Sequence, residues 1–316
     1  MKSPSLVAMA FLVAASGCTK PSAEKKEQLD ANVAPASDAG VTSPAPAAKA
    51  ATDAGVINAT ALPAASIAAM VNPSNLPAYA GATGSIEGTI WVTGDAAPTT
   101  PADFAKCPEA ASIWGHAFRE GAPPAAGAPA PGARPLADAI VVVTGYQGFY
   151  VPEKNEAKEV VIDHCGYRQR TVTLTFGQRL EVRNLSREFW TPKLEPGANQ
   201  VMMMAAPKGD PVRIYPTKPG HWLLTDAGRG YAVVDVYAFL HPLHTSTDAA
   251  GHYRIEGVPL GKVTVNTTHP HIPNSAGVDI DIQANVVHKV DLVLHNEIKK
   301  DAAAPHPDAT APTKPR

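Results

Sequence analysis

Short runs of β-forming residues, each closed by a turn residue, fill most of residues 84–296. These runs are rich in Val, Ile, Thr and Tyr and stop at Gly, Pro, Asn or Asp, as in "SIEGTIWV", "DAIVVVTG", "RTVTLTFG", "RLEVRN", "YAVVDVYAF", "GHYRIEGV", "KVTVNTT" and "HKVDLVLH". No long stretch shows the 3.6-residue periodicity of an amphipathic helix. The pattern predicts an all-β fold made of two small β-sandwich modules.

The two ends of the chain have a composition that does not build a hydrophobic core. Ala, Pro, Ser and Thr dominate there. We therefore expect residues 18–83 to form a disordered tether and residues 299–316 a disordered tail. For the folded part we expect a first module at residues 84–240, whose N-terminal strand is shared with the next module, and a second module at residues 241–298.

The N-terminus has the features of an export signal. Lys2 precedes the apolar residues 6–15, and the segment ends in "AASGC", which is typical of a secretory signal peptide closed by small residues. The motif resembles the lipobox of bacterial lipoproteins, although Ala15 stands where lipoboxes usually have Leu. The resemblance implies a signal peptide at residues 1–17 and lipidation, such as palmitate, on Cys18. The alternative is an ordinary exported protein in which Cys18 is incidental.

A lipid on Cys18 makes the membrane the first expected partner, because buried acyl chains hold a protein at a lipid surface. Thr19 follows the Cys and, by the sorting rule of enteric bacteria, implies the outer membrane. We expect a cell-envelope protein that faces the periplasm or the cell surface.

The two remaining cysteines, Cys107 and Cys165, form an even pair in an oxidising compartment, which favours one disulfide bond. The bond would enclose the Pro-rich residues 121–135 and contribute roughly 3–4 kcal/mol in the chain-entropy model. A reactive thiol pair is the alternative, but the spacing is not that of a CxxC motif.

The charge balance excludes one class of partner. Lys and Arg number 27 against 29 Asp and Glu, for a formal net charge of −2, and there is no basic stripe. Nucleic-acid binding needs a positive surface, so we expect no nucleic-acid partner.

Residues 245–267, "TSTDAAGHYRIEGVPLGKVTVNT", resemble the carboxypeptidase regulatory-like family, a small transthyretin-type β-sandwich. An acidic-Gly turn leads into a strand with Tyr253 and Ile255, and a Pro-x-Gly turn at Pro259 leads out. "GSIEGTIWVTG" resembles the first strand of the same family, displaced by an insertion. Such modules imply a non-catalytic stalk or binding platform.

The insertion carries a second resemblance. "CGYRQRTVTLTFGQRLEVRNLS" and "PTKPGHWLLTDAGRGYAVVDVYAFLHP" resemble the cupredoxin fold, whose members hold type 1 copper through Cys, His and Met. A type 1 centre needs a thiolate and imidazoles. The corresponding positions here are Phe189, Trp190, Asp226, Arg229 and Ala232. We therefore expect a cupredoxin-like module without its copper and without type 1 electron transfer.

Four histidines offer a different metal site. His241 and His244 in "HPLH", with His269 and His271 in "HPHIP", can hold Cu(II) or Zn(II) if their strands are neighbours. The alternative is that these are surface and corner histidines at bends. "VMMM" at residues 201–204 adds soft thioethers, but consecutive strand residues point in opposite directions, so sandwich filling is the simpler interpretation.

Catalysis has no support in the sequence, which contains no G-x-S-x-G elbow, no H-E-x-x-H helix and no Gly-rich phosphate loop. Asp279 and Asp281 are typical of a solvated strand face. The sequence thus favours a non-enzymatic platform, without a cofactor, that binds a protein or carbohydrate partner. The alternatives are a periplasmic copper- or zinc-binding protein and an accessory of an electron-transfer system.

Overall fold

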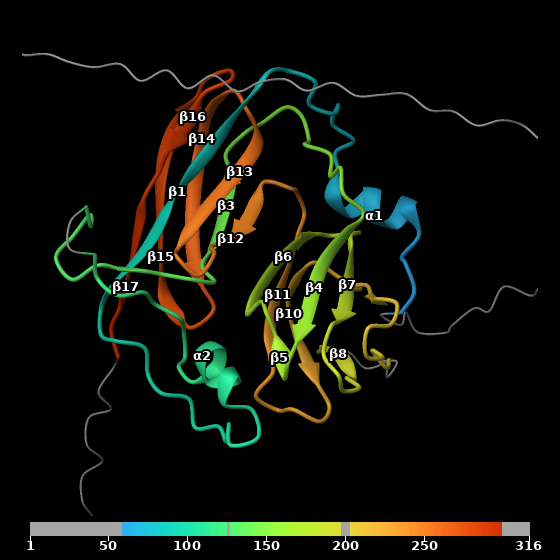
Figure 1. The fold of residues 1–316 in the computed structure, drawn as a ribbon. Helices are drawn as coiled ribbons and strands as arrows, with labels where there is room; N and C mark the ends of the chain where they lie inside the picture. Colours follow the sequence, from blue (N-terminus) through green and yellow to red (C-terminus); the bar gives the residue numbers. More distant parts are fainter. Residues whose placement is uncertain (1–58, 125–126, 197–202, 299–316) are drawn as a thin grey trace, which may run out of the picture. The chain divides into compact units, whose positions relative to one another are not determined.

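The computed structural model describes residues 59–124, 127–196 and 203–298, and this part of the chain is nearly all β-structure (Figure 1). The predicted all-β fold class is confirmed. The predicted signal peptide, Cys18, the tail and most of the tether lie outside the described residues. None of the described helices is long and apolar enough to cross a membrane.

One β-sandwich combines strands from two distant parts of the sequence, and we call it the discontinuous sandwich. Its first sheet centres on β1 (Thr83–Gly94), which pairs with β2 (Arg134–Pro135), β13 (His252–Pro259), β16 (Val287–Lys289) and β17 (Leu292–Asn296). Its second sheet has the order β12 (His244–Ser246), β3 (Ile140–Thr144), β14 (Gly261–His269) and β15 (Ile272–Ile282). Alternate residues of β1, namely Ile86, Ile90 and Val92, are fully buried in the core between the sheets.

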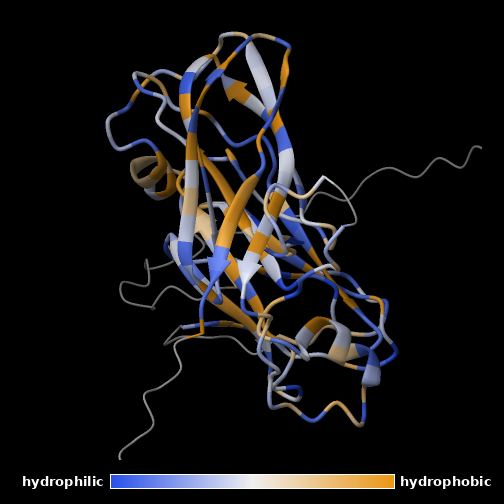
Figure 2. Ribbon diagram, turned by 90° about the vertical axis from the view of Figure 1, so that its left-hand side faces the viewer, coloured by the Kyte–Doolittle hydropathy of each residue, from blue (hydrophilic) through white to orange (hydrophobic). Residues whose placement is uncertain are grey.

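The second β-sandwich is continuous in sequence, and we call it the inserted sandwich. One sheet has the order β6 (Thr171–Thr175), β11 (Val234–Phe239), β10 (Gly220–Asp226) and β8 (Pro192–Glu195). The other has the order β5 (Gly166–Tyr167), β4 (Ala157–Asp163), β7 (Arg179–Asn184) and β9 (Val212–Ile214). Tyr167, Leu174, Leu180 and Trp190 are fully buried in its core. Hydrophobic segments follow the strands in both sandwiches (Figure 2).

The segment between β1 and β2 joins the core of the inserted sandwich. It contains η1 (Pro108–Ala110) and α2 (Ala111–Trp114), and the Trp114 indole donates a hydrogen bond of 2.9 Å to the Val233 carbonyl. Cys107 forms a disulfide bond with Cys165, with 6.1 Å between their Cα atoms. The predicted disulfide pair is thus confirmed.

The strand pairing differs from the expected division at residue 240. β1 was expected to be shared, and it pairs with β13. β3 also lies within residues 84–240, but it pairs with β12 and β14 of the C-terminal part. The alternation of residues identifies a strand and its buried face, whereas the partner strand is set by long-range packing that a local pattern does not contain.

The last residues of the expected tether are also ordered. Helix α1 spans Ala64–Val71, and its Ile67 packs over Gly177, where an added Cβ would lie 2.7 Å from the Ile67 side chain. Ala78 forms a β-bridge with Tyr150. A contact with the folded part fixes these residues even though their composition is that of a linker.

Candidate functional site

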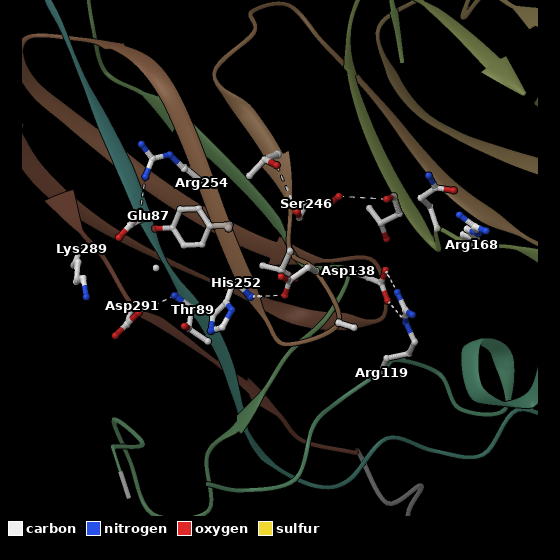
Figure 3. Close-up of a pocket in the computed structure, with 18 residues that line it drawn as sticks. Glu87, Thr89, Arg119, Asp138, Arg168, Ser246, His252, Arg254, Lys289 and Asp291 are labelled. Carbon is white, nitrogen blue, oxygen red and sulfur yellow. Dashed lines mark hydrogen bonds and ion pairs between the residues drawn. The ribbon is translucent and has the colours of Figure 1, made fainter. Parts of the chain in front are cut away.

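A polar cleft of about 850 Å³ opens beside β1 and β13 of the discontinuous sandwich (Figure 3). Strands β1, β13 and β16 contribute Thr89, His252 and Lys289, and Asp291 follows β16. Arg119 and Asp138 line the opposite end. We call this feature the polar cleft.

The charges of the polar cleft are balanced. The lining includes four residues with cationic side chains and four with anionic ones, which are Arg119, Arg168, Arg254 and Lys289 against Glu87, Asp138, Asp248 and Asp291. Most of these are paired with one another or with neighbours. Arg119 holds both oxygens of buried Asp138 at 2.7 Å, and Arg254 contacts Glu87 at 2.7 Å. Balanced charge gives the cleft no preference for a strongly ionic ligand.

Several polar groups of the cleft have unused hydrogen-bonding capacity. The Lys289 ammonium and the His252 ring make no hydrogen bond or ion pair with any described residue and are exposed. The Thr171 hydroxyl is buried without a partner. One oxygen of Asp291 accepts the Thr89 backbone N–H at 2.7 Å, which leaves its second oxygen unused. Unused donors and acceptors in a concave site are the groups that a polar ligand engages.

The polar cleft could not be predicted from the sequence, because its residues come from six separate segments of the chain. The only local signal was the turn before β13, where the Asp248 carboxylate accepts the backbone N–H groups of Ala250 and His252. That turn was recognised as a family motif, but the positions of Thr89, Lys289 and Asp291 depend on the pairing of β1 with β16 and β17.

The four predicted histidine ligands lie in two pairs. The ring centroids of His241 and His244 are 6.4 Å apart, and those of His269 and His271 are 5.8 Å apart. His244 lies opposite Val142, and Val142 lies opposite Asn266, three residues before His269. The neighbouring strands therefore do not bring the four rings together.

His269 and His271 have separate partners. The Nδ1 of buried His269 accepts the backbone N–H of His271 at 3.1 Å. Nε2 of His271 lies 3.5 Å from the Asp235 carboxylate, whose other oxygen is 2.8 Å from Nε2 of His221. Burial raises the pKa of Asp235, but hydrogen bonds from His271 and His221 outweigh that effect and hold the pKa below its usual value.

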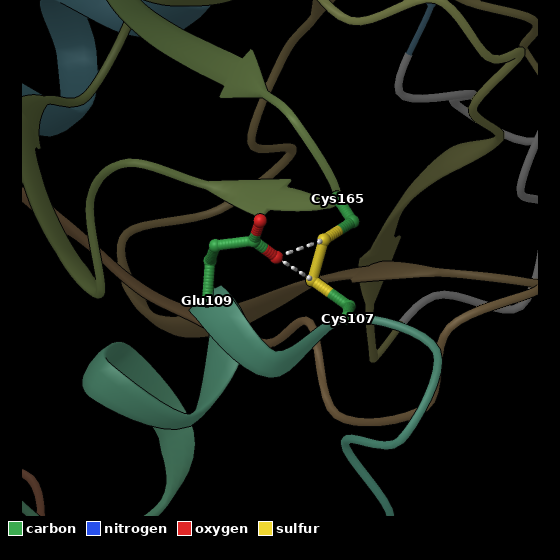
Figure 4. Close-up of side chains that lie close together, drawn as sticks. All are labelled: Cys107, Glu109 and Cys165. Carbon is green, nitrogen blue, oxygen red and sulfur yellow. Dashed lines mark hydrogen bonds between the residues drawn. A yellow bond between two sulfur atoms is a disulfide. The ribbon is translucent and has the colours of Figure 1, made fainter.

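Among the described residues, one group of three potential ligands lies close enough for a metal ion, and it consists of Cys107, Glu109 and Cys165 (Figure 4). The Glu109 carboxylate lies 3.8 Å and 3.7 Å from the two sulfur atoms. Because these sulfurs are joined in a disulfide, they are not the thiolates that bind metals. The group is a structural cross-link.

Two loops meet where the cupredoxin resemblance places the copper ligands. The Arg229 guanidinium lies 4.0 Å from the ring centroid of Trp190 and forms ion pairs with Glu188 and Asp226. Asp226 also accepts the Thr191 backbone N–H at 2.7 Å. A guanidinium held between two carboxylates and an indole offers no lone pair to a metal. These residues do not fit a type 1 copper ion.

The other described residues that the sequence singled out lie in or against a hydrophobic core or at exposed positions. Met203 packs against the core of the inserted sandwich and Met204 is 64% exposed, while Met202 lies outside the described residues. Asp279 accepts the Thr264 hydroxyl at 2.7 Å on an exposed strand face. Trp190 and Trp222 fill the core of the inserted sandwich.

Comparison with known proteins gives weak structural similarity alone. No family model matches the chain, and no curated protein matches it. The structure of amicyanin from Paracoccus versutus matches with 16% identity over 31% of this chain and 96% of that chain, at a TM-score of 0.24. A reduced amicyanin mutant matches with 13% identity over 26% of this chain and 81% of that chain, also at a TM-score of 0.24. The similarity is thus to a β-rich cupredoxin over a small part of the chain.

Proposed function

We propose that this protein is a non-enzymatic, lipid-anchored platform of the cell envelope that binds a glycan in the polar cleft. The observation that carries the proposal is the pair of unengaged side chains, Lys289 and His252, in a concave site of about 850 Å³. A cleft with unengaged groups is where a ligand gains hydrogen bonds without breaking existing ones.

The lining favours a neutral, hydroxyl-rich ligand. The hydroxyl-bearing residues Thr89, Thr245 and Ser246 line the cleft among charges of both signs. Sugar hydroxyls both donate and accept hydrogen bonds, so they match a lining that offers carboxylates, ammonium and hydroxyl groups together. Hydrogen bonds to charged groups are stronger than those between neutral groups. The cleft offers a ligand both cationic donors and anionic acceptors.

The cupredoxin-like and carboxypeptidase regulatory-like resemblances support a platform rather than an enzyme or an electron carrier. The loops at Trp190 and Arg229 contain neither Cys, His nor Met, so the copper chemistry of cupredoxins has no ligands there. In this proposal the inserted sandwich is a scaffold, and the N-terminal residues place the cleft at a distance from the membrane.

The test compares glycan binding by the Cys18→Ser chain with that of Lys289→Ala and His252→Ala variants. Isothermal titration calorimetry with soluble envelope polysaccharides and their fragments should identify a glycan that binds saturably to the Cys18→Ser chain. Each of the two variants should bind that glycan at least tenfold more weakly. The control variants Lys262→Ala and His164→Ala remove a Lys and a His side chain at exposed positions outside the cleft. They should leave the affinity for the glycan unchanged. Equal loss in the controls, or binding of peptides in place of glycans, would contradict the proposal.

A further inference from the structure

The bend "HPLH" between β11 and β12 places two imidazole rings side by side. The rings of His241 and His244 have centroids 6.4 Å apart at an interplanar angle of 58°. The backbone N–H of His244 donates to the Pro242 carbonyl at 2.9 Å. The ring centroid of Phe239 lies 4.8 Å from that of His244, and the ring centroid of Tyr146 lies 6.1 Å from that of His241. Aromatic rings therefore flank both imidazoles.

The hydrogen bonds around His244 determine which nitrogen carries its proton. The Thr175 hydroxyl oxygen lies 2.6 Å from a Glu153 carboxylate oxygen and 3.2 Å from Nε2 of His244. Because the hydroxyl has one hydrogen and donates it to the carboxylate, its oxygen accepts from Nε2–H of His244. The Nδ1 atom of His244 is then left with a lone pair.

That lone pair has no partner, and the Nδ1 atom of His241 has none either. The Nδ1 atoms of both rings are buried and make no hydrogen bond in the described part of the chain. A buried, unsatisfied acceptor costs free energy, and a cation shared by the two nitrogens would remove that cost.

We propose that His241 and His244 form a two-coordinate site for a soft monovalent cation, Cu(I), through their Nδ1 atoms. With metal–nitrogen bonds of about 2 Å, a linear pair of imidazoles has ring centroids about 6 Å apart, and a tetrahedral angle brings them to about 5 Å. The observed 6.4 Å agrees with the linear arrangement, which Cu(I) adopts with two neutral nitrogen ligands.

The surroundings disfavour a divalent ion at the same place. Zn(II) takes at least three protein ligands, and the described residues offer no third His, Cys, Asp or Glu atom within reach of this pair. A second cavity, of about 960 Å³, reaches His244 and provides an entry path.

The test is an anaerobic Cu(I) titration of the full-length chain carrying Cys18→Ser, with a chromophoric Cu(I) chelator as competitor and no thiol reductant. The substitution removes the thiol outside the disulfide, so sulfur ligation by cysteine does not compete. We expect one Cu(I) per chain, and X-ray absorption should show two nitrogen neighbours at about 2 Å and no sulfur.

The variants are chosen to keep the fold. His244→Gln retains an N–H donor for Thr175, and His241→Phe retains a ring beside Tyr146; each should weaken Cu(I) binding at least tenfold with a melting temperature close to the parent. His252→Ala and a Met203→Leu/Met204→Leu double variant should bind as the parent does. Unchanged binding in the two site variants, or a sulfur neighbour in the absorption spectrum, would overturn the assignment. Both results are independent of glycan binding in the polar cleft.

Discussion

At His269 a buried neutral imidazole makes folding sensitive to acid. Burial, aided by the charges of His271 and Arg170, lowers the pKa of His269 to about 3, whereas an unfolded His titrates near 6.5. Between these values the unfolded chain binds a proton that the folded chain does not. The free energy of unfolding therefore falls as the pH decreases from 6.5, by about 1.4 kcal/mol per pH unit for this group.

Replacing His269 with Asn should flatten that dependence. The Asn side-chain oxygen can accept the His271 backbone N–H that Nδ1 accepts now, but it does not titrate. Urea unfolding at pH 7, 6, 5 and 4 measures how steeply the free energy of unfolding falls with pH. Below pH 6.5 the slope of the variant should be smaller than that of the parent by about 1.4 kcal/mol per pH unit. The exposed His164→Asn should leave the slope as it is. An unchanged slope in the His269 variant would mean that the ring is protonated in the folded state.

At the scale of single residues, the sequence predicted the disulfide pair but not the surroundings of the histidines. The Cys107 and Cys165 pair followed from their number and the expected compartment, and the structure joins them. The histidine cluster rested on two motifs that share a His-Pro step. In the structure His269 is tied to its own hairpin, because its role depends on which backbone groups face it in three dimensions.

At the scale of the strand, Gly88 lets β1 change partners. β1 pairs in parallel with β16 at residues 85–87 and with β17 at residues 90–94. At the break between them the Val290 N–H donates to the Glu87 carbonyl at 2.9 Å. A Cβ on Gly88 would lie 1.9 Å from the Val290 carbonyl oxygen, so a side chain there has no room.

Gly88→Ala should therefore destabilise the fold by roughly 1–3 kcal/mol, the usual cost of overpacking a core. Gly230→Ala is the matched control, because nothing lies within 4 Å of a Cβ added at Gly230. The free energy of unfolding of this variant should therefore change little. Chemical denaturation of both variants measures the difference. If the two glycine variants were equally stable, the close approach of β1 and Val290 would not be a constraint on the fold.

β1 also shows why elements are predicted better than their arrangement. The run "SIEGTIWV" predicted a strand, and its residues Ile86, Ile90 and Val92 are fully buried. Nothing in that segment indicates that Asp291, about 200 residues away, accepts the Thr89 N–H. Since the polar cleft is built from such distant contacts, local patterns identified its strands and not the site.

At the scale of the whole molecule, the disulfide joins the segment after β1 to the inserted sandwich. Cys107 and Cys165 are separated by 58 residues, and the closed loop contains β2 and β3 of the discontinuous sandwich and β4 of the inserted one. A cross-link over such a loop restricts the unfolded chain by about 4 kcal/mol in the chain-entropy model. The disulfide therefore contributes to the stability of the folded chain as a unit.

The Cys107→Ala/Cys165→Ala variant should lose about 4 kcal/mol of unfolding free energy, measured by denaturant unfolding without reductant. Treating the parent with dithiothreitol should give a similar loss, whereas the double variant should not respond to it. The Trp114 indole, which packs beside this cross-link and bonds the Val233 carbonyl, provides one of the fluorescence probes of unfolding. A loss below about 1 kcal/mol would show that the unfolded chain stays compact without the bond, so that the cross-link restricts little of its freedom.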